Sequence, residues 1–128
     1  MVIFDTNALL RYVLQDIEEM ANSVENVINT SSCVFPVEVV AEMVYVLSKV
    51  YKIQRNEIAL TIKGIIDIEN ITVPESDVVV DALDVFSDTK LDFVDCLMIG
   101  YAKSKNYSVF TFDDDLKKVL NTVTRRNS

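Results

Sequence analysis

Short apolar runs alternate with longer amphipathic segments along the whole chain. The short runs are typical of buried strands. We predict strands in "MVIF", "SCVFP", "NITVP" and "YSVFTF", at residues 1–4, 32–36, 70–74 and 107–112. The longer segments repeat apolar residues at helical spacing. We predict helices over residues 6–15, 17–30, 37–51, 55–69, 76–88, 92–106 and 114–121.

This alternation of strands and helices is typical of α/β folds. It predicts a three-layer sandwich, in which a short central parallel sheet is flanked by helices. The length of 128 residues fits one domain, residues 1–128. Half of the residues are hydrophobic, which is enough for a packed core.

The residue types limit the chemistry. The chain has no histidine, which excludes Ser-His-Asp catalysis, Cys-His catalysis and histidine-ligated zinc. Its two cysteines, Cys33 and Cys96, lie in apolar stretches, and we expect them to be buried, reduced thiols. Neither glycine belongs to a phosphate-binding loop. Any reaction must therefore use carboxylates, hydroxyls, lysines or a bound metal.

Charge and hydropathy indicate the compartment and the kind of partner. No apolar run approaches the roughly 18 residues of a membrane span, and the first residues have no basic n-region. We therefore expect a soluble, cytoplasmic protein. The formal net charge is -8, and acidic chains do not usually bind nucleic acid through a generic basic patch. Either the partners are basic or some of the acids hold cations.

Two aspartates directly follow predicted strands. Asp5 follows the first strand and Asp113 follows the last. Ligands of open parallel sheets gather at the carboxyl ends of the strands, so both aspartates are candidate ligands. The alternative is that the three acids beginning at Asp113 only cap a helix. After Asp5, either Thr6 or Asn7 is predicted to cap the first helix.

Further acids lie on two predicted helices. Asp92 and Asp95 are spaced i, i+3 and share one helix face. The apolar residues that continue this face predict that Asp95 is drawn against the core, where a carboxylate needs a cation. The alternative is that both acids compensate the helix dipole. On the helix over 37–51, Glu38 and Glu42 are equal candidates, because spacing does not choose between them.

Carboxylates from separate elements suit Mg²⁺ or Mn²⁺, which prefer hard oxygen ligands. Such ions activate a water and neutralise the charge on a phosphodiester. A divalent metal site is therefore the chemistry that these acids favour.

Four motifs in order resemble the PIN domain and, more narrowly, the VapC-type toxin ribonucleases of toxin–antitoxin pairs. They are "FDTNALLR", "VVAEMVYVLSK", "LDFVDCLMIGYAK" and "VFTFDDDLKK". The resemblance spans nearly the whole chain and selects Glu42 over Glu38. It implies that the catalytic, metal-holding residues are Asp5, Glu42, Asp95 and Asp113. It implies supporting roles for Thr6, Asn7, Asp92, Thr111 and Asp115.

The resemblance also implies an activity and partners. It implies an endoribonuclease that depends on Mg²⁺ or Mn²⁺ and cuts RNA, often structured RNA such as tRNA. It further implies a homodimer, a tight complex with a small antitoxin and no membrane partner. Basic residues that would bind RNA are sparse in this chain. The candidates are Arg11, Lys49, Lys52 and Arg55.

Three other interpretations remain. A PIN fold without catalysis would serve as a binding module. A receiver-type phosphoacceptor domain would need paired acids after the first strand and a lysine after the last, whereas Asp5 stands alone and acids follow the last strand. A haloacid-dehalogenase-like phosphatase would need an aspartate at position 7, which is Asn7.

Overall fold

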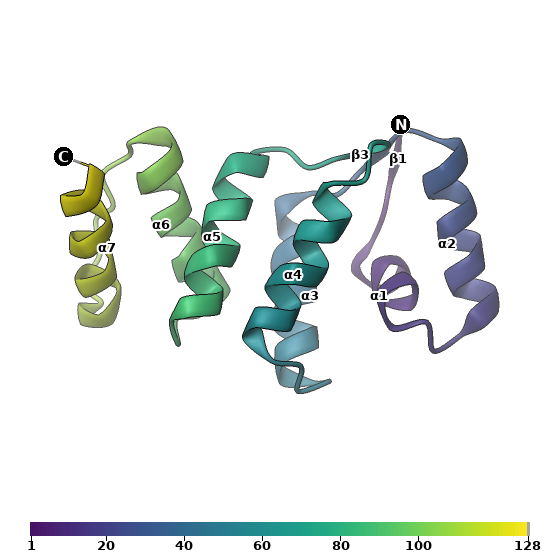
Figure 1. The fold of residues 1–128 in the computed structure, drawn as a ribbon, viewed down its shortest axis with the longest axis horizontal. Coiled ribbons are helices and arrows are strands. Elements are labelled where there is room, and N and C mark those ends of the chain that lie inside the picture. Colours follow the sequence, from purple (N-terminus) through teal and green to yellow (C-terminus); the bar gives the residue numbers. More distant parts are fainter. Residues whose placement is uncertain (128) are drawn as a thin grey trace. The chain divides into compact units, whose positions relative to one another are not determined.

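The structure, a computed structural model, describes residues 1–127. The chain forms two compact units, Met1–Pro74 and the part that begins at Glu75. Within these residues, the first unit contains three strands and four helices, and the second contains three helices (Figure 1). The predicted α/β class is confirmed, with a short parallel sheet and helices that are consistent with a PIN-like three-layer sandwich.

The sheet of the first unit has three parallel strands with β2 in the centre. The strands are β1 (Val2–Ile3), β2 (Cys33–Val34) and β3 (Ile71–Thr72). Val2 lies opposite Cys33, and Cys33 lies opposite Ile71. The Phe35 N–H extends the ladder by donating to the Thr72 carbonyl at 2.9 Å. Three of the four predicted strands are thus confirmed, although each is shorter than its apolar run.

Four helices carry the core of the first unit. They are α1 (Thr6–Leu14), α2 (Glu18–Thr30), α3 (Val37–Lys49) and α4 (Arg55–Ile66). Helix α1 packs against α2 and α3, and α3 packs against α4. Leu9, Met43, Leu47 and Ile62 are almost completely buried, because the apolar stripes of these helices face one another.

The second unit is built on the close packing of two helices. Its helices are α5 (Ser76–Asp88), α6 (Phe93–Lys105) and α7 (Asp114–Asn127). Helix α6 packs against both α5 and α7. At Gly100 a Cβ atom would lie 2.4 Å from the Val78 carbonyl oxygen, so only glycine lets the two backbones approach this closely. All seven predicted helices are confirmed, and the last one continues beyond its predicted end.

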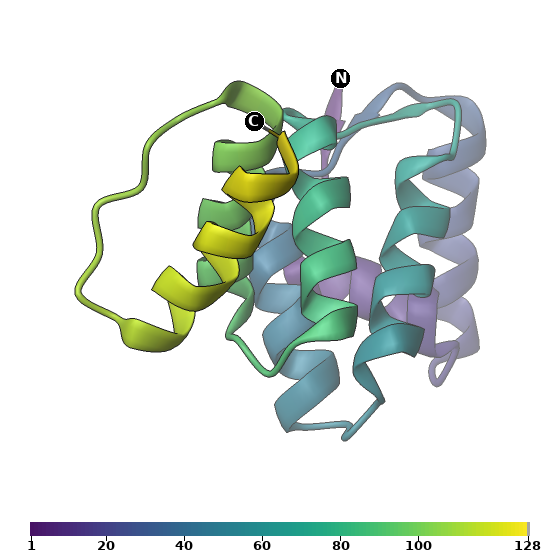
Figure 2. The same cartoon turned by 60° about the vertical axis from the view of Figure 1, so that its left-hand side comes forward.

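The predicted fourth strand, residues 107–112, is wrong. The segment forms no strand and runs as a long loop between α6 and α7 (Figure 2). Phe110 is 88% exposed and Phe112 is 84% exposed, and their rings meet edge to face at 5.3 Å. The physical reason is that β-favouring residues form a strand only where a neighbouring strand supplies hydrogen bonds, and no described strand pairs with this segment.

Both cysteines are buried thiols that form no disulfide within the described residues, as predicted. Burial raises the pKa of the Cys33 thiol and therefore keeps it in its unreactive protonated form. Within the described residues, no helix combines the length and the apolar character that crossing a bilayer requires.

Candidate functional site

Asp5 leaves β1 and caps α1. Its backbone is extended, and its Oδ1 accepts a hydrogen bond from the Ala8 N–H at 2.8 Å. The prediction that Thr6 or Asn7 caps this helix is therefore wrong: Thr6 is already the first helical residue and is buried. The reason is that an aspartate is as good a cap as an asparagine, and Asp5 is the residue with the extended backbone that a cap needs.

Glu42 lies on the solvent side of α3. Its neighbours Met43 and Val44 are buried, whereas Glu42 itself is exposed. Glu38, one turn earlier, is exposed as well. Asp5 and Glu42 therefore both belong to the first unit, where α1, which Asp5 caps, packs against α3. Burial does not distinguish Glu42 from Glu38, because both are exposed.

Asp92 and Asp95 begin α6 in the second unit. Asp92 occupies the N-cap position but makes no capping hydrogen bond through its side chain, and Asp95 lies in the first turn. Asp95 is half-buried and Asp92 is exposed, as the apolar face of the helix predicted. Burial raises the pKa of the Asp95 carboxyl, and the negative charges of Asp113 and Asp92 raise it further.

Asp113 precedes α7 in the same way that Asp5 precedes α1. Its Oδ1 accepts from the Leu116 N–H at 2.8 Å, and its own N–H donates to the Thr111 hydroxyl at 3.0 Å. Asp115 is exposed in the first turn of α7. Because its charge acts on Asp95, Asp113 lies within electrostatic reach of the start of α6.

The two capping aspartates share one geometry. Asp5 and Asp113 each bind a backbone N–H three residues later through Oδ1. No protein hydrogen bond to the second oxygen, Oδ2, is present in either residue within the described part of the chain. Each aspartate therefore has a fixed orientation and a carboxylate oxygen that remains able to bind a cation.

In the described residues, no three cysteine or acidic side chains lie close enough together to form a metal site on their own. The predicted acids are divided between the units: Asp5 and Glu42 belong to the first, and Asp95 and Asp113 belong to the second. The metal site remains a prediction.

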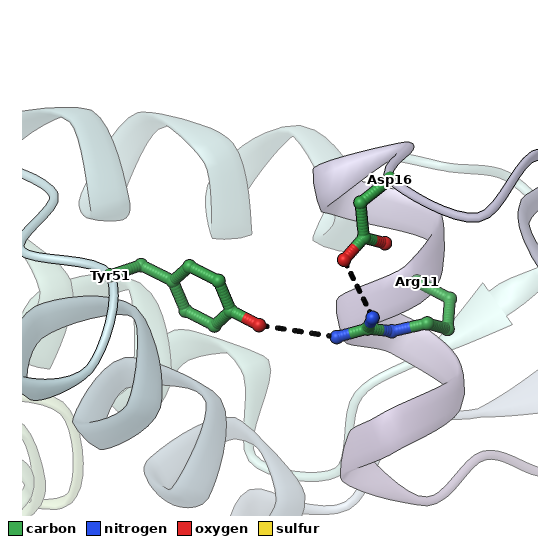
Figure 3. Close-up of polar contacts among 3 residues, drawn as sticks. All are labelled: Arg11, Asp16 and Tyr51. Atoms are coloured by element: carbon green, nitrogen blue, oxygen red, sulfur yellow. Dashed lines mark hydrogen bonds and ion pairs between the residues drawn. The ribbon is translucent and has the colours of Figure 1, made fainter.

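The structure contains a polar cluster of Arg11, Asp16 and Tyr51, of which only Arg11 was predicted as a functional residue. Arg11 on α1 pairs with Asp16 through Nη1 at 2.6 Å, and its Nη2 donates to the Tyr51 hydroxyl at 3.4 Å (Figure 3). Arg11 was a candidate for RNA binding, but Asp16 and Tyr51 were missed. No sequence signal links Arg11 to Tyr51, because they are 40 residues apart.

The remaining candidates lie at the surface of the first unit. Lys49 and Lys52 are exposed, and Arg55 is half-buried. Asn7 is exposed and lines a cavity that also contains Asp5 and Arg11.

A family model described as "PIN domain" matches residues 2–120, and all four of the predicted catalytic acids lie within the match. Comparison with curated proteins found no match, and neither did comparison with solved structures. The chain therefore belongs to the PIN domain family, whose members are generally nucleases.

Proposed function

We propose that this protein is a metal-dependent endoribonuclease and the VapC-type toxin of a type II toxin–antitoxin pair. The observation that carries this proposal is the PIN domain match over residues 2–120, which includes a complete set of four acids. The same match favours a nuclease over a receiver-type phosphoacceptor domain.

In this proposal the residues that hold Mg²⁺ or Mn²⁺ are Asp5, Glu42, Asp95 and Asp113. Their donor atoms suit the metal, because carboxylate oxygens are the hard ligands that both ions prefer. The half-buried Asp95, whose neighbours are like-charged, is the kind of carboxylate that a cation stabilises. A bound ion would supply an activated water and neutralise charge on the scissile phosphodiester.

The chain's own contribution is to hold the carboxylates in fixed orientations. The Ala8 and Leu116 N–H groups hold one oxygen of Asp5 and Asp113, respectively. The Thr111 hydroxyl accepts from the Asp113 N–H and fixes the turn before α7. In this proposal the supporting residues are Thr6, Asn7, Asp92, Thr111 and Asp115.

The proposed partners follow from the family and the charge. The substrate is RNA, with tRNA as one candidate, and hydrolysis leaves 5′-phosphate and 3′-hydroxyl ends. The protein acts as a homodimer in the cytoplasm. A small antitoxin with a basic segment complements a toxin whose net charge is -8.

Asp5→Asn tests the metal site without disturbing the helix cap. Asparagine caps a helix as well as aspartate does, but it removes the negative charge that a divalent ion needs. We expect the variant to unfold at the wild-type temperature and to lose RNA cleavage by about 100-fold or more. Cleavage is measured on total RNA with Mg²⁺ or Mn²⁺, followed by sequencing of the new ends.

Glu69→Gln is the matched control, because Glu69 is an exposed acid of the same unit and lies outside the proposed site. It should cut RNA at the wild-type rate. Cleavage by Asp5→Asn at the wild-type rate would show that the metal assignment is wrong. A wild-type protein that binds the antitoxin but cuts no RNA with either ion would instead be a PIN-fold binding module.

A further inference from the structure

Arg11 has an unusual environment for an arginine on a helix surface. Its side chain is only 13% exposed, although Asp16, its ion-pair partner, is 41% exposed. The Asp16 carboxylate binds Nη1, and the Tyr51 hydroxyl accepts weakly from Nη2 at 3.4 Å (Figure 3). Two residues from different parts of the first unit thus hold the guanidinium in one place.

The third nitrogen of this guanidinium has no partner. Arg11 Nε is inaccessible to water and makes no hydrogen bond, and it is the only such buried side-chain nitrogen or oxygen among the described residues. Nε and Nη2 form the side edge of the guanidinium, which is the fork that binds carboxylates and phosphates in a bidentate way. This edge therefore carries no hydrogen bond at Nε, which protein atoms cover, and a weak one at Nη2.

The Tyr51 hydroxyl adds a donor beside this fork. A tyrosine hydroxyl both accepts and donates. Because its oxygen accepts from Arg11 Nη2, its own proton remains available for an oxygen of a ligand. The Nη2–H and the Tyr51 O–H are therefore present for one anion, and the buried Nε–H becomes a third donor once the Arg11 side chain rotates to uncover it.

The surroundings of Arg11 and Tyr51 carry charges of both signs. Arg11 lines a cavity of about 420 Å³ between α1 and α2, which the carboxylates of Asp5 and Glu19 also line and Tyr51 does not. Tyr51 is flanked in the chain by the exposed Lys49 and Lys52, a local excess of positive charge in a protein of net charge -8. An anion held between Arg11 and Tyr51 would lie beside the cavity that contains a proposed catalytic acid.

We propose that Arg11 and Tyr51 bind a backbone phosphate of the RNA substrate, and that Asp16 is a positioning residue that fixes the guanidinium. This inference rests on the proposed nuclease function and identifies a place where the substrate strand is held. Asp16 binds the end of the guanidinium that the phosphate does not use, so the two anions do not compete for the same nitrogen.

The first test measures binding of a short fluorescent single-stranded RNA in EDTA, where metal does not contribute and the strand is not cut. Arg11→Lys keeps the charge but loses the fork, and we expect about tenfold weaker binding. Tyr51→Phe should also weaken binding. Arg11→Ala should reduce the slope of log Kd against log salt by about 0.7, the value for one phosphate contact on a single strand. Lys103→Ala, which removes a charge paired with Asp81 at 3.8 Å, is the matched control and should leave Kd unchanged.

Asp16→Asn gives the most discriminating result. If charge alone matters, removal of a negative charge strengthens RNA binding. If Asp16 positions Arg11, the same substitution weakens binding and raises KM for cleavage while kcat stays near its wild-type value. Tighter binding by Asp16→Asn would overturn the positioning role. Should Arg11→Ala fail to fold, Arg11→Lys and Tyr51→Phe still decide the question.

The outcomes separate this inference from the nuclease proposal. If the wild type cuts RNA while Arg11→Lys and Tyr51→Phe bind as tightly as the wild type, the phosphate site is wrong and the nuclease proposal stands. If these variants lose binding while Asp5→Asn still cuts RNA, the phosphate site stands and the metal assignment is wrong. A wild type that neither binds nor cuts RNA overturns both.

Discussion

Asp5 and Asp113 each have two roles: each caps a helix, and each is a ligand in the proposed metal site. The helix needs a single acceptor for an N–H of its first turn, and Oδ1 supplies it. Asparagine would meet that need equally well, so capping does not explain the choice of aspartate. The negative charge adds only about 0.3–1 kcal/mol through the helix dipole, whereas the proposed metal site depends on it. Aspartate-to-asparagine changes therefore separate the two roles, whereas alanine would remove both.

Asp95 supports a prediction about pH. Burial, together with the charges of Asp113 and Asp92, raises the pKa of Asp95. The folded protein therefore binds this proton more tightly than the unfolded chain does. The stability that this proton contributes is complete below the unfolded pKa of about 3.9 and is lost as the pH rises through the folded pKa. At neutral pH without metal, the Asp95 carboxylate destabilises the fold.

We expect Asp95→Asn to raise the unfolding temperature at pH 7 in EDTA, and the gain to shrink as the pH falls toward 4. Thermal unfolding followed by circular dichroism at a series of pH values measures both. Glu69→Gln is the control and should show neither effect. A gain that stays constant with pH would mean that packing of the amide, and not the charge of the carboxylate, stabilises the variant.

Gly100 and Gly64 form a matched pair for testing the packing of the second unit. A Cβ at Gly100 would meet the Val78 carbonyl oxygen at 2.4 Å, whereas a Cβ at Gly64 on α4 meets nothing within 4 Å. We expect Gly100→Ala to destabilise the protein by about 1–3 kcal/mol because α5 and α6 must separate. Gly64→Ala should stabilise it by about 0.5–1 kcal/mol, because alanine favours a helix interior. Urea unfolding measures both values, and equal effects of the two substitutions would contradict the close contact.

At the scale of elements, ion pairs join the start of α5 to the end of α6. Lys105 lies 3.2 Å from Glu75 and 3.3 Å from Asp77. The Val78 backbone N–H lowers the pKa of Asp77, and Lys105 lowers it further. The stability that Asp77 contributes is present above its unfolded pKa of about 3.9 and is lost as the pH falls through the lowered folded value.

Lys105→Met should therefore destabilise the protein near pH 7 and have little effect in acid, where its partners are protonated. Because these pairs are exposed, we expect the unfolding temperature to fall by no more than a few degrees. Lys103→Met, which loses a longer pair of 3.8 Å to Asp81, should have a smaller effect. Thermal unfolding at low and high salt checks the result, and a salt-independent decrease would point to lost packing of the side-chain stem instead.

The elements show which parts of the fold local sequence determines. The helices were predictable because each carries its own apolar stripe, as Leu9 and Leu47 do on α1 and α3. The segment 107–112 was not, because a strand depends on a partner that its own residues do not specify. The cap at Asp5 was assigned to the next residues, because three adjacent residues are all good caps. The contact of Arg11 with Tyr51 could not be predicted from helical or strand periodicity, because the two residues are 40 positions apart in the chain.

For the whole molecule, the main question is whether the four acids act on one ion. The sequence order of the acids and their approximate burial were predictable. Whether they converge on one ion was not predictable from local sequence, because convergence depends on contacts between residues far apart in the chain. The first unit carries Asp5 and Glu42, and the second carries Asp95 and Asp113. A shared ion would make the proposed metal affinity a property of both units together.

A double-mutant cycle on metal binding tests this sharing. Asp5→Asn and Asp113→Asn keep both helix caps and remove one ligand charge from each unit. If both ligands hold the same ion, each substitution alone should weaken Mn²⁺ binding about tenfold or more. The double variant should then lose much less than the product of the two effects, because residues that share a partner are not additive.

Titration calorimetry gives the Mn²⁺ affinity, and the Mn²⁺-dependent rise in unfolding temperature gives an independent measure of it. Two Mn²⁺ binding events, of which each single substitution weakens a different one, would mean that the aspartates of the two units bind separate ions, and the proposed four-carboxylate site would be wrong.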